Sequence, residues 1–221
     1  MGFAHQPPIS AIPKPTHVLE QEAEVAMTTT TPLLSFEDYV AYDDGTAARY
    51  ELVDGELVEM PLPTFRHFLI AKCLEQALDA AIQQLGQPWL CFREAGVRTG
   101  IRKSRLTDVC VVTLEQAREL QGSALIFSTP PLLVAEVVSP DSVTRDYRYK
   151  RTEYAALGVP EYWIVDPLQA KVTVLQWQEG MYEETVFVSS QPLISPTFPG
   201  LDLTVATILA AGDLAEDEET L

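Results

Sequence analysis

The sequence predicts an α/β fold in which a central mixed β-sheet is flanked by helices and carries an added β-hairpin on one edge. Apolar residues recur at helical spacing between Phe65 and Leu85. Two later runs are rich in Val and nearly continuous in apolar character, and short strand-like runs flank an Asp-Gly and a Glu-Gly pair. Helical and strand periods thus alternate along the chain, as they do in folds that combine both kinds of element.

The composition is that of a globular protein with room for one domain. The chain has 221 residues, of which 47% are hydrophobic and 21% charged, and domains commonly hold roughly 100 to 200 residues. No apolar run approaches the roughly 20 residues that cross a bilayer, so we expect no membrane segment. Cys73, Cys91 and Cys110 are odd in number and lie among apolar neighbours, which favours core thiols of a cytoplasmic protein over disulfides.

The two ends of the chain differ from its middle. Residues 1–26 hold four prolines and no apolar block, which indicates a disordered leader rather than a secretory signal. Met27 offers a second start, and the closing residues are strongly acidic. We therefore expect a leader over residues 1–30, one domain over residues 31–208 and an acidic tail over residues 209–221.

Between residues 35 and 86, residues typical of helix ends and tight turns mark the expected elements. Ser35 and Asp38 have the spacing of a helix N-terminus. Asp54-Gly55 is a strong signal for a tight hairpin turn, and Gly86 ends the long apolar stripe. The expected elements are a helix over residues 35–42, a hairpin over residues 50–60 and a long helix over residues 65–85.

The second part alternates strands with one helix. The Val-rich runs are typical of central strands that are covered on both faces. Gly158 and Pro160 end the helix, and Glu179-Gly180 forms the turn of a hairpin that adds strands to one edge of the sheet. Strands are expected over residues 89–92, 96–98, 108–112, 132–138 and 161–166, the helix from residue 144 or 145 to residue 157, and the hairpin over residues 171–178 and 181–188.

Two acidic side chains interrupt the predicted central strands. Asp108 opens the run TDVCVV, and Glu136 lies within LLVAEVV. A carboxylate in such a strand is costly to bury unless it is paired or bound to a cation. Two carboxylates, a carbonyl such as that of Val137, and water would supply the oxygen shell that Mg²⁺ prefers. Alternatively, each acid lies at a strand end and meets an arginine or backbone N–H groups.

The distribution of charge is uneven. A net charge of −17 argues against a nucleic-acid partner, because phosphate binding relies on Lys and Arg. Residues 93–151, however, hold ten Lys or Arg against seven Asp or Glu. These cations form either two solvated surfaces or a nucleic-acid contact beside the acids. The two clusters are Arg93, Arg98, Arg102, Lys103, Arg105 and Arg145, Arg148, Lys150, Arg151.

Three segments carry a resemblance to a known family. YELVDGELVEMP, TDVCVV and LLVAEVVSPDSVTRDYRYKRTEYAALGVPEYWIVDP resemble the hallmark blocks of the Uma-type restriction endonucleases, which belong to the PD-(D/E)xK nuclease superfamily. The resemblance covers residues 35–203. It implies a restriction-endonuclease-like fold and an endonuclease that hydrolyses DNA with Mg²⁺, or with Mn²⁺ in its place.

The resemblance also implies roles for particular acids. Asp108 matches the superfamily's strand aspartate, although Thr107 stands where a proline is usual. Glu136 matches the acidic residue of the D/E-x-K element. Glu51 in the first hairpin matches the family's early acid, as a third metal ligand or a partner that acts through water.

The lysine of the D/E-x-K element is displaced in this chain. Val138 occupies its usual position, and Lys150 on the following helix matches the lysine that substitutes for it in the family. Lys150 would orient the attacking water or stabilise developing charge. Alternatively, Asp146 and Lys150 form an ordinary surface pair four residues apart on a helix.

The sequence leaves more than one alternative for the substrate and for whether the site is active. The side chains expected to contact substrate are Arg102, Lys103, Arg145, Arg148 and His67, although a histidine in an apolar stripe is more often a packing residue. The net charge of −17 favours an alternative, an inactive relative that binds nucleic acid or protein. RNA and branched DNA are further candidate substrates, and by analogy a symmetric homodimer would suit cleavage of duplex DNA.

Overall fold

The computed structural model of the protein describes residue 1 and residues 32–213. The predicted leader, apart from residue 1, and residues 214–221 of the predicted acidic tail lie outside the described residues. Within the described part, no helix is long and apolar enough to cross a membrane. The helices are α1 (Phe36–Val40), α2 (Phe65–Leu85), α3 (Leu114–Glu119), the π-helical turn η1 (Arg145–Lys150), α4 (Arg151–Leu157) and α5 (Val205–Ala210).

The strands of residues 32–213 form two sheets. The strands are β1 (Arg49–Val53), β2 (Glu56–Met60), β3 (Trp89–Arg93), β4 (Gly96–Gly100), β5 (Lys103–Leu106), β6 (Val109–Thr113), β7 (Ile126–Phe127), β8 (Leu133–Val137), β9 (Glu161–Asp166), β10 (Lys171–Gln178) and β11 (Met181–Val188). The larger sheet has the order β11-β10-β9-β8-β6-β3 and the smaller one β2-β1-β5-β4-β7. The larger sheet is mixed, because β8 pairs with β9 in parallel and its other pairings are antiparallel.

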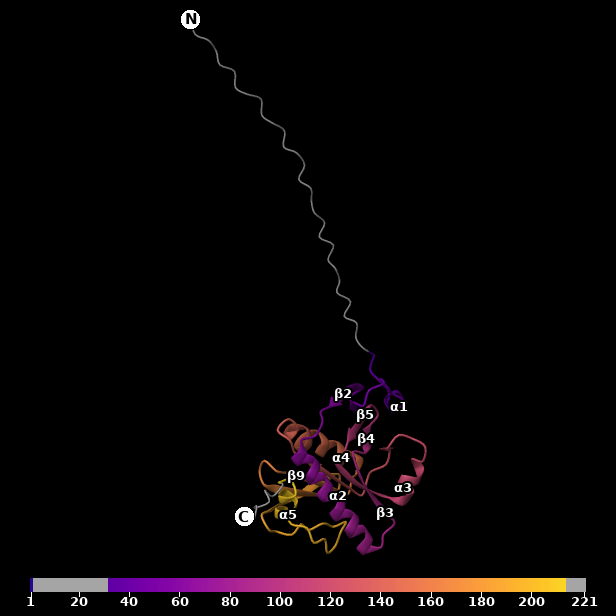
Figure 1. Ribbon diagram of the computed structural model, residues 1–221. Helices are drawn as coiled ribbons and strands as arrows, with labels where there is room; N and C mark the ends of the chain where they lie inside the picture. Colours follow the sequence, from indigo (N-terminus) through magenta and orange to yellow (C-terminus); the bar gives the residue numbers. More distant parts are fainter. Residues whose placement is uncertain (2–31, 214–221) are drawn as a thin grey trace, which may run out of the picture. The chain divides into compact units, whose positions relative to one another are not determined.

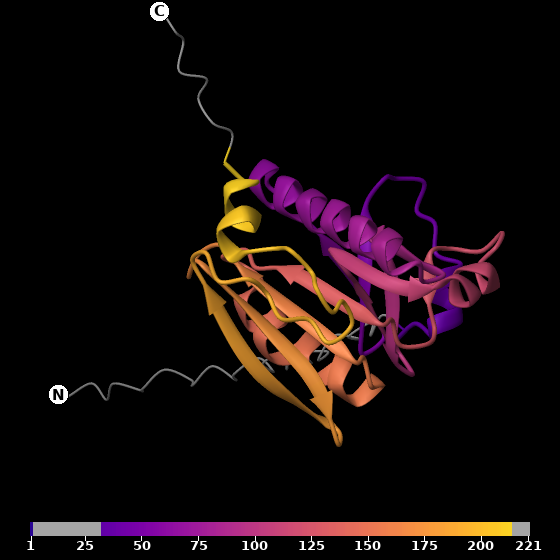
Figure 2. The ribbon, with the colours of Figure 1, turned by 90° about the horizontal axis from the view of Figure 1, so that it is seen from below.

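Both faces of the larger sheet are buried. Ile70, Leu74 and Leu78 of α2 pack on one face, in a core that also contains residues of α5. Tyr154 of α4 packs on the opposite face, in a core shared with β4 and β7 of the smaller sheet. Figures 1 and 2 show α2 running along one side of the sheet, with α5 beside one end of it. Strands covered on both faces explain the continuous apolar runs of β6 and β8.

Local signals account for the elements that the sequence predicts. At α1, Ser35 and Asp38 form a capping box, and α2 ends at Gly86 with a φ of 63°. Asp54 and Gly55 both have positive φ, which the tight turn between β1 and β2 requires. The α/β fold, both hairpins and the long helix are as predicted.

Several elements were not predicted. The smaller sheet depends on β5, whose sequence is KSRL, and short segments such as α3, β7 and α5 give little periodic signal. The helix expected from residue 144 or 145 does form, but its first turn is π-helical. Single π-turns inside helices often lie at functional sites, and this turn carries Lys150.

Candidate active site

Strand pairing brings the two predicted acids together. In the antiparallel pair of β6 and β8, Val109 lies opposite Ala135 and Cys110 opposite Val134. The same register, extended by one residue, sets Asp108 opposite Glu136. Side chains of directly opposed residues lie on the same face, with Cβ atoms about 4.5–5.5 Å apart. Asp108 and Glu136 therefore lie near each other at the end of the strand pair, where both border one pocket and the charge of Asp108 acts on Glu136; we call them the facing pair.

Asp108 is held by a side chain and by the backbone. Nε2 of His67 lies 3.0 Å from Oδ1 of Asp108, and the backbone N–H of Val137 donates to Oδ2 at 2.7 Å. Burial raises the pKa of Asp108, but the hydrogen bond and charge of His67 outweigh it, and the net pKa is lowered. Asp108 is therefore an ionised carboxylate at neutral pH.

Glu136 is the more deeply buried acid, with 1% of its surface exposed. The hydroxyl of Tyr154 donates to Oε1 at 2.8 Å, and Nζ of Lys150 lies 2.7 Å from Oε2. Burial is the main cause that raises the pKa of Glu136 to about 8; the charge and hydrogen bond of Lys150 oppose this rise, and the charges of Asp108 and Asp146 add to it. Glu136 thus holds its proton more tightly than an ordinary carboxyl group, mainly because it is buried.

Lys150 extends from the end of η1 into this group of acids. Its ammonium donates to the carbonyl of Leu106 at 3.1 Å, and it lies 3.6 Å from Oε1 of Glu51 and 3.9 Å from Oδ1 of Asp146. Burial lowers the pKa of Lys150, but the surrounding carboxylates raise it by more. The lysine stays protonated. The alternative of a surface pair with Asp146 is wrong, because both side chains are buried.

A second ion-pair network supports the lysine from the smaller sheet. Arg105 of β5 donates from Nη1 to Glu51 at 2.8 Å, and from Nε and Nη2 to Glu153 at 2.7 and 2.6 Å. Glu51 also accepts the backbone N–H of Leu106 at 3.2 Å. The side chain of Arg105 thereby connects β5 with β1 and α4, and Glu51 links this network to Lys150.

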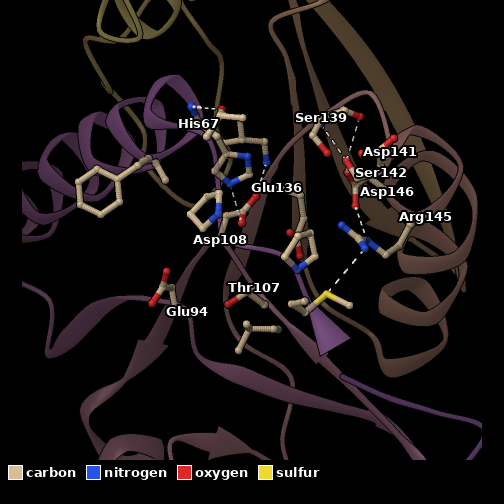
Figure 3. A pocket seen from close by; sticks show the side chains of 18 of the residues that line it. His67, Glu94, Thr107, Asp108, Glu136, Ser139, Asp141, Ser142, Arg145 and Asp146 are labelled. Carbon is tan, nitrogen blue, oxygen red and sulfur yellow. Dashed lines mark hydrogen bonds and ion pairs between the residues drawn. The ribbon is translucent and has the colours of Figure 1, made fainter. Parts of the chain in front are cut away.

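A cavity of about 340 Å³, which we call the acidic pocket, is bordered by Glu51, His67, Asp108, Glu136 and Lys150. Figure 3 shows Asp108 and His67 on one side, and the loop of Ser139 and Ser142 together with Asp146 of η1 on the other. The side chains that border the pocket include six carboxylates and four Lys or Arg. This is a formal excess of two negative charges, which one divalent cation would neutralise. The charged lining consists of Glu51, Glu94, Asp108, Glu136, Asp141, Asp146, Arg49, Arg93, Arg145 and Lys150.

Comparison with known proteins places the chain in a family. A family model described as Uma2, putative restriction endonuclease, matches residues 36–206. The chain belongs to the Uma2 family. No curated protein is similar enough to count as a match.

A solved structure has a similar fold. This Uma2 chain is similar to a putative nuclease of the DUF820 group from Anabaena variabilis, with 18% identity and a TM-score of 0.68. The alignment covers 81% of this chain and 99% of that one. At this identity the likeness concerns the fold, and it confirms the restriction-endonuclease-like architecture that the resemblance implied.

Most predicted site residues of the Uma2 chain meet at the acidic pocket. Seven of them border it: Glu51, His67, Asp108, Glu136, Val137, Arg145 and Lys150. Arg102, Lys103 and Arg148 do not border it. Lys103 is instead paired with Asp54 at 3.1 Å and with Glu153 at 3.7 Å, so its charge is already neutralised within the fold. Arg102 and Arg148 are exposed, and a contact with substrate stays a prediction for both.

Sequence reasoning underestimated other residues of the Uma2 site. Tyr154 was not among the predicted site residues, yet it donates to Glu136. Asp146 was expected to pair with Lys150, but its burial and its hydrogen bond from Ser142 were not anticipated. Arg105 was placed in a cluster expected to be either a solvated surface or a nucleic-acid contact, but it is buried and paired with Glu51 and Glu153. The available signal was spacing, because Asp146, Lys150 and Tyr154 recur at four residues on one helix face.

Proposed function

We propose that the protein is a metal-dependent endonuclease that hydrolyses the phosphodiester bonds of DNA. The observation that carries the proposal is the facing pair of Asp108 and Glu136, with the buried ammonium of Lys150 at 2.7 Å from Glu136. Membership of the Uma2 family supports a nuclease. Metal dependence and DNA as substrate rest on the chemistry of the pocket.

The donor set fits a hard divalent cation such as Mg²⁺ or Mn²⁺. Asp108 and Glu136 would hold it together with the carbonyl of Val137. Among the described residues, no three His, Cys, Asp or Glu side chains are grouped to hold a metal ion by themselves. Water would therefore complete the shell, as Mg²⁺ sites commonly allow. The chemistry that such a cation supplies when bound is a lowered pKa for water and neutralisation of phosphoryl charge.

The chain's own residues would position the reacting groups. Lys150 keeps its proton and lies beside Glu136, so its ammonium can orient the attacking water or stabilise charge that develops on the phosphoryl oxygens. Glu51 and the carbonyl of Leu106 fix the direction of that ammonium. His67 fixes the carboxylate of Asp108. Such preorganised charges require no rearrangement when the substrate binds.

The arginines predicted to contact substrate would bind phosphates of the DNA backbone. Arg145 borders the acidic pocket and would bind a phosphate next to the one that is cleaved. The exposed Arg102 and Arg148 would contact more distant phosphates, which adds affinity without base selectivity.

The test is cleavage by purified protein of supercoiled, linear and single-stranded DNA and of RNA, with Mg²⁺, Mn²⁺ or EDTA. The wild type should cut DNA with either metal and not with EDTA, and Asp108→Asn and Glu136→Gln should be inactive. Asp141→Asn is the matched control, because Asp141 borders the pocket but is exposed. Cutting that persists in Asp108→Asn and Glu136→Gln would overturn the proposed centre.

One observation favours a second candidate function. The net charge of −17 is unusual for a protein that binds phosphates, and it suits a module that has kept the fold and binds a protein partner. In that case the wild type would bind no metal and cut no nucleic acid under any of the conditions above.

A further inference from the structure

Glu136 and Lys150 are buried where they border the acidic pocket, while Asp108 beside them is partly exposed, with 24% of its side chain accessible. Glu136 and Lys150 are each exposed by 2% or less. A phosphate that reaches them has to enter the cavity. At about 340 Å³, the cavity is at the lower end of the range of small-molecule pockets. It suits one nucleotide better than a length of duplex.

One wall of the pocket mouth is apolar. The segment from Met60 to Thr64 connects β2 with α2 and carries Leu62, which is 87% exposed. Phe68, on the first turns of α2, borders the same pocket and is 38% exposed. An intact duplex stacks its bases inside and offers such side chains little contact. Unpaired bases, in contrast, stack on aromatic rings.

Cations are placed beside this apolar wall. The guanidinium of Arg93 lies 4.6 Å from the ring centroid of Phe68, and Arg49 and Arg145 also border the pocket. Each of these arginines also has a carboxylate nearby: Arg93 pairs with Glu75 at 3.0 Å, Arg49 pairs with Glu94, and Arg145 lies 3.7 Å from Asp146. The pocket therefore offers little free positive charge, which suits at most the few phosphates of a short strand. Tight binding of a duplex relies on a broader basic surface, which a chain of net charge −17 does not readily provide.

We infer that the substrate is cut in a single-stranded stretch, whose unpaired base lies against Phe68 and Leu62 while its phosphate reaches Asp108, Glu136 and Lys150. The inference rests on the proposed nuclease function and names the substrate class of that site. Enzymes with recessed centres commonly act on single strands or on nucleotides turned out of the duplex. Here Phe68 and Leu62 bind substrate and take no part in the chemistry.

The first experiment compares one labelled DNA sequence in three forms: as a single strand, as a full duplex, and as a duplex with a short unpaired stretch. The single strand and the unpaired stretch should be cut with kcat/KM at least about tenfold higher than the full duplex, as expected for the loss of one base stack. Equal rates on all three forms would overturn the inference and leave the nuclease proposal standing.

The second experiment separates stacking from packing. Phe68→Leu retains an apolar side chain but removes the ring, and it should raise KM for the single strand about tenfold with little change in kcat. Phe68→Trp should restore binding. Phe65→Leu is the matched control, because Phe65 lies on the same helix, is 63% exposed and does not border the pocket. Leu62→Ser, at a fully exposed position, gives a second test should Phe68 variants fold poorly.

Binding without catalysis keeps the two proposals distinguishable. Fluorescence anisotropy of the labelled strands in EDTA should show the same preference for the single strand and the same weakening in Phe68→Leu. If no form is cut, the nuclease proposal fails, and this measurement alone decides the substrate class. Equal binding of single strand and duplex, or unchanged binding by Phe68→Leu and Leu62→Ser, would overturn the inference.

Discussion

Nζ of Lys150 lies 2.7 Å from Oε2 of Glu136, although Val138 stands two residues after Glu136, at the position where the family resemblance leads one to expect a lysine. The π-helical turn η1 ends at Lys150 and follows the loop after β8. It places the ammonium of Lys150 next to the carboxylate of Glu136. The charges of the proposed centre thus come from two elements, β8 and η1, instead of one strand. Each of the predictions below depends on this arrangement or on the network that supports it.

Removal of the Lys150 charge should destabilise the fold as well as abolish turnover. Lys150→Met leaves Glu136, Glu51 and Asp146 buried without their shared cation, and breaking such a pair costs about 3–5 kcal/mol. The free energy of unfolding in urea should fall by this amount. Adding Glu136→Gln in the same chain should restore part of it. An unchanged unfolding midpoint for Lys150→Met would contradict the burial of this charge.

Arg105 should be needed for stability although it does not border the pocket. Arg105→Ala removes the cation shared by Glu51 and Glu153, so we expect a loss of about 3–5 kcal/mol. Arg105→Lys should recover little, because an ammonium cannot reproduce the hydrogen bonds of the guanidinium to both acids. Arg118→Ala, on the exposed side of α3, is the control and should be neutral. The measurement is thermal and urea unfolding of all four proteins, wild type included.

The contribution of Glu153 should depend on pH. Burial raises the pKa of Glu153, but hydrogen bonds and charge from Arg105 outweigh it, and the net pKa is below the ordinary 4.5. A carboxylate with a lowered pKa stabilises the fold above its unfolded pKa and loses this effect as pH falls through the folded one. Wild type should therefore be more stable than Glu153→Gln at pH 7, and the gap should close below about pH 4.5. A difference in unfolding free energy between wild type and Glu153→Gln that stays constant or grows as the pH falls would contradict this prediction.

Tyr154 should hold Glu136 in place through its hydroxyl. Tyr154→Phe leaves Oε1 of Glu136 without the donor at 2.8 Å, and an unsatisfied buried acceptor costs about 1–3 kcal/mol. Tyr162→Phe is the comparison, because its hydroxyl donates to the carbonyl of Asp146 and not to Glu136. Both variants should lose stability, but Tyr154→Phe should also lose more activity. Equal activity of Tyr154→Phe and Tyr162→Phe would contradict this role and show that Tyr154 only contributes to packing.

Elements that short stretches of sequence specify could be predicted from the sequence. The apolar stripe of α2 and the Asp54-Gly55 turn specify their own structures, because periodicity and positive φ are properties of short segments. Asp108 and Glu136 were also visible, since a charge inside a Val-rich run is costly unless it is compensated. Their facing geometry follows from register, which two adjacent buried strands fix strongly.

Long-range partners determined the parts that sequence reasoning missed. Arg105 belongs to the polar segment KSRL, and it is buried only because Glu51 and Glu153 come from distant parts of the chain. Spacing alone made Asp146 and Lys150 look like a surface pair, although tertiary packing buries both. Nothing in the sequence of η1 marks a π-helical turn. Such features depend on which elements pack together, and a single sequence does not reveal that.

The most direct test of the cation site is a calorimetric titration of the protein with Mn²⁺. If Asp108 and Glu136 hold the ion, the wild type and Asp141→Asn should bind one ion per chain, and Asp108→Asn and Glu136→Gln should bind none in the same range. Equal binding by all four proteins, or no binding by the wild type, would contradict the account.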